Sequence, residues 1–182
     1  MGRLILVRHP PVALAWTGRC YGQSDMGLSR AGRAMLAPLA DHLAALQPDM
    51  IIHSGMRRTR SLADNLARRT SLSPHEDQQW RERDFGSWEG RGWNAIYRET
   101  CNAMDGMVDA PGHFRPGGNG ETTCEMIERI RGALAVVPRR GCIAVITHGG
   151  PIAAVRHLLD GTRITDIAKG VMPPATFSIM EF

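Results

Sequence analysis

Two strongly apolar runs dominate the hydrophobic pattern of this chain. The first spans residues 4–7 and is followed by Arg8 and His9; the second spans residues 142–147 and is followed by His148. Short continuous apolar runs bounded by turn residues are typical of strands buried on both faces of a sheet. The pattern therefore predicts two buried strands that both end in a histidine. In open α/β sheets, ligands bind beyond the carboxyl ends of such strands.

Turn residues follow both runs. Pro10 and Pro11 stop the first strand. After the second, Gly149 and its neighbouring glycine let a backbone approach a ligand closely, and Pro151 suits the first turn of a helix. By itself, a strand that ends in arginine and histidine is also typical of an ordinary surface cap, so the rest of the chain must decide between the two interpretations.

Helical periodicity predicts the elements of the first half. Ser29 is the expected N-cap of a helix, which Pro38 should kink or divide. A short buried strand is expected over residues 50–53, and Ser54 is the expected cap of the helix that follows.

The second half alternates between helical patterns and loops. Helices are predicted over residues 93–104 and 121–137, and a third begins near Pro151. Residues 105–120, dense in glycine and proline, are predicted as a loop that could cover a site. Residues 175–181 are predicted to form an edge strand.

Three arginines cluster at the start of the helix after Ser54. Arg58 shares a ridge with Leu62 and Leu66, on the edge of the helix that faces inward, whereas Arg57 and Arg60 are expected to be solvated. Arg58 is therefore predicted to lie over the sheet edge, in a first turn whose free backbone N–H groups also favour an anion.

Length and composition favour one compact unit. The 182 residues, 43% of them hydrophobic, suffice for a single core, so one domain over residues 1–182 is expected. Apolar runs fall short of the roughly 20 residues that span a bilayer, and the chain enters its first strand without a secretory apolar segment. A cytoplasmic protein without a membrane partner is expected. Four scattered cysteines argue against a disulfide framework and a structural zinc site.

The formal net charge of +4 allows an anionic partner. Lys169 is the one lysine, so the basicity is arginine spread along the chain. The clustered arginines are not interleaved with the aromatic residues that a nucleic-acid platform needs. A small anionic substrate explains the charge better than nucleic acid does.

The polar residues at the ends of the two buried strands are the candidates for a catalytic site. If the two strands are parallel neighbours, His9 and His148 converge with Arg8 and Arg58. Guanidinium groups can clamp phosphoryl oxygens, and a neutral imidazole is a competent nucleophile for phosphoryl transfer. The cations would stabilise charge on the equatorial oxygens, and a carboxylic acid should protonate the leaving alcohol. The constellation predicts a phosphoryl-transfer site.

Six short segments, in their order along the chain, resemble motifs of the histidine phosphatase superfamily, in its phosphoglycerate-mutase-like branch. The resemblance covers nearly the full length of the chain. The similar segments are Arg8-His9, residues 25–29 with Gly32, residues 54–58, residues 82–86, residues 120–122 and His148-Gly149.

The resemblance implies the fold and the principal roles. The implied fold is a three-layer α/β/α sandwich with a mostly parallel central sheet and an antiparallel edge strand. His9 would be the nucleophile that becomes phosphohistidine. Arg8, Arg58 and His148 would hold the phosphoryl group, and Glu82 would be the general acid. Neither a metal nor a cofactor is implied.

Other residues are assigned with alternatives. Asp84 and Glu89 compete with Glu82 for the acid role. Tyr21 and Gly22, in the loop before residue 25, and Gly149 are predicted to bind substrate; for Tyr21 the alternative is simple packing of its loop.

The loop after His9 departs from the family pattern. Where the family usually has Arg-His-Gly, this chain has Arg-His-Pro, and Pro11, Val12 and Ala15 replace polar residues, including an asparagine that helps to hold phosphate. Such a loop donates fewer hydrogen bonds and is stiffer, but turnover is still expected. This loop, together with residues 18–25, resembles the α-ribazole phosphatase group of cobalamin synthesis. The expected substrate is therefore α-ribazole 5′-phosphate, whose flat base could stack on an aromatic ring.

Two alternative functions stay open. One is a phosphohistidine protein phosphatase, and the other is a phosphate-ligand-binding module that has lost turnover. A phosphoglycerate mutase is disfavoured, because residues 86–120 leave little room for the longer insertion of mutases. The oligomeric state is also open, with a homodimer as one alternative.

Overall fold

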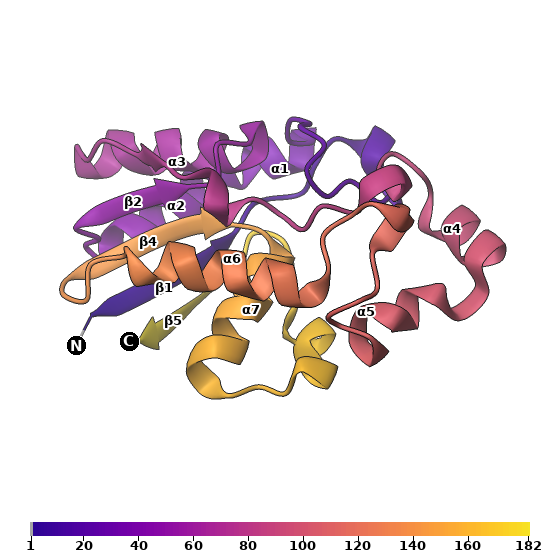
Figure 1. The fold of residues 1–182 in the computed structure, drawn as a ribbon. Coiled ribbons are helices and arrows are strands. Elements are labelled where there is room, and N and C mark those ends of the chain that lie inside the picture. Colours follow the sequence, from indigo (N-terminus) through magenta and orange to yellow (C-terminus); the bar gives the residue numbers. More distant parts are fainter. Residues whose placement is uncertain (1) are drawn as a thin grey trace.

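The computed structural model describes residues 2–182, and over these residues the chain forms a five-stranded sheet with helices on both faces (Figure 1). The strand order is β3-β2-β4-β1-β5, in which β5 pairs antiparallel with β1 and the other pairs are parallel. The strands are β1 (Arg3–Arg8), β2 (Met50–His53), β3 (His75–Glu76), β4 (Cys142–Thr147) and β5 (Phe177–Glu181).

Seven α-helices and six short 3₁₀ helices connect these strands within residues 2–182. The α-helices are α1 (Arg30–Ala34), α2 (Leu36–Ala45), α3 (Arg57–Thr70), α4 (Trp93–Thr100), α5 (Gly106–Asp109), α6 (Thr123–Ala135) and α7 (Gly149–Asp160). The 3₁₀ helices are η1 (Leu14–Trp16), η2 (Gln78–Trp80), η3 (Gly86–Trp88), η4 (Cys101–Asp105), η5 (Pro116–Gly118) and η6 (Ile164–Gly170).

The alternation of side chains along β1 produces the three layers. Leu4 and Leu6 pack in one apolar cluster with α6 and α7, whereas Ile5 and Val7 pack in a second cluster with α2 and α3. All four side chains are fully buried. The predicted α/β/α sandwich with a mostly parallel sheet and an antiparallel edge strand is confirmed.

The structure corrects some of the predicted element boundaries. Pro38 lies in the first turn of α2, and the predicted helix is divided just before it, between α1 and α2. The helix expected over 93–104 ends at Thr100, since Cys101 adopts a positive φ of 51° and a 3₁₀ helix follows. The loop expected over 105–120 contains α5 and η5.

The prediction that Ser54 caps the next helix is wrong. The N-cap of α3 is Met56, and the backbone N–H of Arg57 is capped instead by the carboxylate of Asp25, at 2.8 Å, from the loop after β1. A carboxylate from a distant segment replaces the local hydroxyl because the Ser54 side chain is turned toward the sheet edge, where it contacts His148.

The register of β1 and β4 positions the functional edge. Arg8 pairs with Thr147, so the residues that follow, His9 and His148, leave the sheet side by side. Beyond the carboxyl ends of the strands lie α4 and α5 (Figure 1). A small apolar cluster around Cys20, Trp88 and Ile96 supports this region. Across residues 2–182, no helix combines the length and apolarity that crossing a bilayer would require.

Candidate active site

His9 is held as a neutral imidazole with a free nitrogen. Its Nδ1 lies 2.8 Å from the carbonyl oxygen of Pro10, which can only accept, so Nδ1 carries the proton and Nε2 presents a lone pair. Within residues 2–182, Nε2 has no hydrogen-bond partner. Burial, reinforced by the charge of Arg58, lowers the pKa of His9 to about 3. Proline at position 10 removes a backbone N–H but keeps the carbonyl that fixes the tautomer.

His148 is oriented through both of its ring nitrogens. Arg58 Nε donates to Nδ1 at 3.3 Å, so the proton lies on Nε2, which donates to Ser54 Oγ at 2.8 Å. Ser54 then donates to Thr59 Oγ1, and Thr59 donates to the carbonyl of Met56. Burial, followed by the charge of Arg58, lowers the pKa of His148 well below its ordinary value. The ring centroids of the two histidines lie 5.1 Å apart in an edge-on arrangement.

Arg58 is fully buried, as its place on the apolar ridge of α3 predicts. Besides its bond to His148, its guanidinium donates to the carbonyls of Ser24 (2.7 Å) and Gly22 (2.6 Å) and contacts Met26 Sδ. These contacts use four of its five N–H groups and fix the loop after β1. Its Cζ also lies 5.4 Å from the centre of the Tyr21 ring. Arg58 therefore connects the histidine pair to the loop of residues 21–25.

Arg8 ends β1 directly before His9 and lines a pocket. Its Nη1 donates to the carbonyl of Met172, and its buried Nε has no hydrogen-bond partner within residues 2–182. A Cβ at Gly149 would lie 3.4 Å from Arg8 Cζ and 2.8 Å from Val171 Cγ1. Glycine at this position allows the close approach of both side chains to the start of α7.

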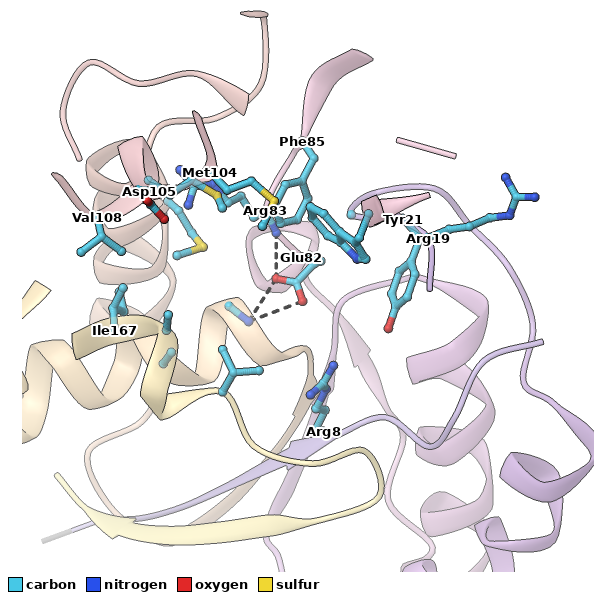
Figure 2. A pocket seen from close by; sticks show the side chains of 18 of the residues that line it. Arg8, Arg19, Tyr21, Glu82, Arg83, Phe85, Met104, Asp105, Val108 and Ile167 are labelled. Carbon is cyan, nitrogen blue, oxygen red and sulfur yellow. Dashed lines mark hydrogen bonds between the residues drawn. The ribbon is translucent and has the colours of Figure 1, made fainter. Parts of the chain in front are cut away.

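Glu82 faces the same space as Arg8. Its Oε1 accepts from the backbone N–H of Gly150, in the first turn of α7, at 3.1 Å and from that of Arg83 at 2.9 Å (Figure 2). The competing carboxylates have other roles in the structure. Asp84 accepts the N–H of Gly86 within a turn. Glu89 accepts four hydrogen bonds, from the backbone N–H groups of residues 23, 24 and 85 and from the Ser24 hydroxyl, and so fixes two loops.

A pocket of about 620 Å³ opens next to this cluster, within the size range of small-ligand sites (Figure 2). Arg8, Tyr21, Gly22 and Glu82 line it. The rest of the wall is mainly apolar and aromatic, and includes Phe85, Trp93, Met104, Met107, Val108, Met126, Ile167 and Val171. His9 and His148 are almost completely buried, at 1% and 0% exposure.

The structure therefore brings the predicted site residues together at one edge of the sheet, with Gly149 packed against Arg8 rather than on the pocket wall. Sequence reasoning missed Ser54 as a partner of His148, and Thr59 as the partner of Ser54. It also missed Gly150 as a donor to Glu82, and the apolar wall from α5 and η6. Those contributions depend on long-range contacts, and periodicity gives no signal for them.

A mostly parallel α/β sheet whose strand-end histidines lie beside Arg8 and Arg58 presents the residue types that bind and transfer a phosphoryl group. This combination defines a class of phosphoryl-handling proteins. The family comparison agrees with this class. A family model described as "Histidine phosphatase superfamily (branch 1)" matches residues 4–182, and the chain belongs to that superfamily.

Individual relatives differ in what they act on. A glucosyl-3-phosphoglycerate phosphatase of Mycobacterium tuberculosis is 35% identical over 88 residues, which is 48% of this chain and 40% of the relative. The solved structure of a mycobacterial glucosyl-3-phosphoglycerate phosphatase with inorganic phosphate superposes with a TM-score of 0.83 at 26% identity, over 97% of this chain and 88% of the other. The α-ribazole phosphatase of Shigella flexneri gives a TM-score of 0.84 at 20% identity, over 97% and 89%, which shows a shared fold.

Proposed function

We propose that the chain is a phosphomonoesterase that hydrolyses a small phosphate ester through a phosphohistidine intermediate on His9. The observation that carries the proposal is the state of His9: a buried, neutral imidazole whose Nδ1–H is tied to the Pro10 carbonyl and whose Nε2 lone pair is free. Arg8, Arg58 and His148 surround it, and Glu82 lies on the adjoining pocket wall.

The reaction has two balanced steps. His9 Nε2 attacks phosphorus, the bond from phosphorus to the ester oxygen breaks, and Glu82 gives its proton to the leaving alkoxide. A water molecule then attacks the phosphohistidine, Glu82 takes a proton from that water, and the bond from nitrogen to phosphorus breaks to release phosphate. The guanidinium groups of Arg8 and Arg58 stabilise the charge on the equatorial oxygens in both steps.

We assign the role of general acid to Glu82 rather than Glu89 because the two carboxylates have different surroundings. Glu82 lines the pocket, whereas both oxygens of Glu89 are committed to four donors from two loops. A carboxylate that donates a proton must reach the leaving oxygen within about 2.6–3.2 Å. The geometry favours Glu82 for that contact.

For the physiological substrate we propose α-ribazole 5′-phosphate. The support is the pocket wall, where aromatic, methionine and aliphatic side chains suit a flat apolar base better than a sugar or an amino acid. Tyr21 is the aromatic residue we assign to stack on the base, and Gly22 lets the chain pass close to Glu89, where a Cβ would lie 2.2 Å from the carboxylate oxygen.

The test is a trapping experiment combined with a substrate panel. Enzyme quenched in alkaline detergent during turnover should carry a protein-bound phosphate that is stable in alkali and lost in acid, and His9→Ala should lack it. In the panel, α-ribazole 5′-phosphate should give a higher kcat/KM than glucosyl-3-phosphoglycerate, phosphoserine and a phosphorylated histidine domain.

Full turnover by His9→Ala would overturn the assignment of His9 as nucleophile, and preference for the phosphorylated domain would favour a protein phosphatase. Phosphate binding without hydrolysis of any ester would favour the inactive module.

Matched carboxylate variants test the acid. Glu82→Gln should slow hydrolysis of alkyl phosphates far more than that of p-nitrophenyl phosphate, whose leaving group needs little protonation. Glu89→Gln exchanges an acceptor oxygen for an amide donor, leaves buried donors unpaired, and should reduce stability by about 1–3 kcal/mol without that substrate selectivity. If Glu89→Gln, and not Glu82→Gln, slowed alkyl phosphates selectively, the general-acid role would belong to Glu89.

A further inference from the structure

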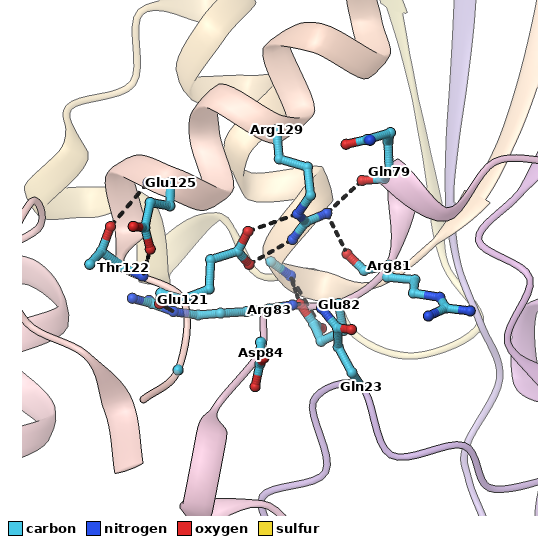
Figure 3. A network of polar contacts seen from close by, with 12 residues as sticks. Gln23, Gln79, Arg81, Glu82, Arg83, Asp84, Glu121, Thr122, Glu125 and Arg129 are labelled. Carbon is cyan, nitrogen blue, oxygen red and sulfur yellow. Dashed lines mark hydrogen bonds and ion pairs between the residues drawn. The ribbon is translucent and has the colours of Figure 1, made fainter. Parts of the chain in front are cut away.

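The segment that carries Glu82 has an irregular backbone that is held by side chains. Three consecutive carbonyl groups before Glu82 accept hydrogen bonds from other elements. Arg129 Nη1, from α6, donates to the carbonyls of Gln79 (2.5 Å) and Arg81 (3.0 Å) (Figure 3). Thr147 Oγ1, at the end of β4, donates to the carbonyl of Trp80 (2.6 Å). Of the three bonds, that to Trp80 is buried, that to Arg81 is partly buried and that to Gln79 is exposed. A buried carbonyl outside a regular ladder needs such a partner. Residues 79–81 are therefore anchored to the sheet and to α6.

Glu121 fixes the orientation of Arg129. The two form a bidentate ion pair, with Nε and Nη2 each 2.7 Å from a carboxylate oxygen, and their side chains are only 17% and 13% exposed. Bidentate pairing sets the plane of the guanidinium, which leaves Nη1 directed at the carbonyls of the acid segment. Lysine could supply the charge but not this fork.

Glu121 also holds the chain that follows Glu82, through its own backbone groups. The backbone N–H of Glu121 donates to the carbonyl of Asp84 at 2.8 Å, and Arg83 Nε donates to the carbonyl of Glu121 at 2.9 Å. Glu82 is thus flanked on both sides by residues tied to Glu121 and Arg129 (Figure 3).

We propose that Arg129, assisted by Thr147, is a positioning residue that holds the Glu82 carboxylate at the leaving oxygen of the substrate. The inference rests on the proposed function, in which Glu82 protonates that oxygen. Arg129 acts through the backbone of residues 79–81. A displacement of about 1 Å at a proton donor can reduce the rate on the order of 100-fold, so loss of the anchor should reduce leaving-group protonation.

The experiment compares Arg129→Lys with Arg131→Lys, a matched control on the same helix whose exposed side chain pairs with Glu128. The measured quantity is kcat/KM for an alkyl phosphate and for p-nitrophenyl phosphate. Arg129→Lys should lower the alkyl phosphate value roughly 10- to 100-fold and the p-nitrophenyl phosphate value by less than about 3-fold. Arg131→Lys should change neither. In a Glu82→Gln background, Arg129→Lys should add no further selective loss.

Thr147→Val is a second variant, similar in shape, that removes the hydroxyl donor to the Trp80 carbonyl. It should also lower kcat/KM for the alkyl phosphate more than for p-nitrophenyl phosphate. If Arg129→Lys does not fold, Thr147→Val provides the test of the positioning role. Equal losses for both substrates, or unchanged kinetics, in the folded variants would overturn the positioning role. If Glu82→Gln itself shows no dependence on the leaving group, the acid assignment of the proposed function fails instead.

Discussion

At the scale of single residues, the site depends on charge states set by burial. His9 and His148 are neutral because the protein interior disfavours an imidazolium and Arg58 adds a nearby positive charge. The carbonyl of Pro10 explains why a proline can follow His9, the proposed nucleophile: the tautomer of His9 needs an acceptor at position 10, and proline retains one. Cys20, buried beside Glu89 and Glu82, illustrates the same physics, since burial raises the pKa of its thiol to about 12.

The two histidines predict how stability depends on pH. In the unfolded chain they titrate near 6.5, whereas in the folded protein the pKa of His9 is about 3 and that of His148 is also lowered. Between these pH values the unfolded state binds more protons, so the free energy of unfolding should fall as the pH decreases below about 6.5. The slope should approach about 1.4 kcal/mol per pH unit for each histidine that stays neutral.

Urea unfolding between pH 7 and pH 5, in phosphate-free buffer, measures this loss. His9→Gln should reduce the slope, and His42→Gln, which alters an exposed histidine on α2, should leave it unchanged. A wild-type protein that is equally stable at both pH values would contradict the buried neutral state.

At the scale of elements, hydrophobic periodicity predicted the strands and the inward face of α3, but not every helix boundary. Ser29 caps α1 as predicted, through a hydrogen bond from the N–H of Gly32 at 2.9 Å. Ser54 does not cap α3, because its hydroxyl is engaged by His148. The cap from Asp25 links the loop of residues 21–25 to the helix that carries Arg58.

Asp25 should therefore contribute to stability through α3. Asp25→Ala is expected to reduce the free energy of unfolding by about 1 kcal/mol, since it leaves a first-turn N–H unsatisfied, whereas Asp25→Asn keeps an acceptor oxygen and should lose less. Asp64→Ala, on the exposed face in the middle of the same helix, provides the control. Denaturant unfolding checks the order of the three variants, and equal losses in Asp25→Ala and Asp64→Ala would contradict the cap.

At the scale of the whole molecule, the pocket is assembled from segments distant in sequence. Its polar side comes from the end of β1 and the loop around Glu82. Its apolar side comes from Met104, Met107 and Val108 and from residues 167, 168 and 171, and Asp105 and Asp109 also line the pocket. Figure 2 shows Val108 and Ile167 on the side of the pocket opposite Tyr21. The architecture separates the expected phosphoryl site from a surface that would select the leaving group.

A charge on the apolar wall should therefore change specificity. Val108→Asp should lower kcat/KM for phosphate esters of large apolar alcohols by roughly 10-fold or more, because a carboxylate at this half-buried position opposes an apolar group. It should have little effect on methyl phosphate. Val136→Asp, at an exposed position after α6, is the control. A uniform loss for all esters in Val108→Asp would argue against a leaving-group pocket on this wall.

The sequence by itself predicted the buried strands, the polar residues at their ends and the inward position of Arg58, because strand burial and helical periodicity are local properties of residue order. The layered fold was implied by the resemblance to the histidine phosphatase superfamily. Only the tertiary structure decided which carboxylate faces the pocket, since Glu82, Asp84 and Glu89 lie within eight residues of one another. Glu82 lines the pocket and bonds Gly150, Asp84 bonds Gly86 in a local turn, and Glu89 bonds the loop of residues 23 and 24. The contacts of His148 with Ser54 and of Arg129 with residues 79–81 likewise arise from packing between separate elements, which no local pattern encodes.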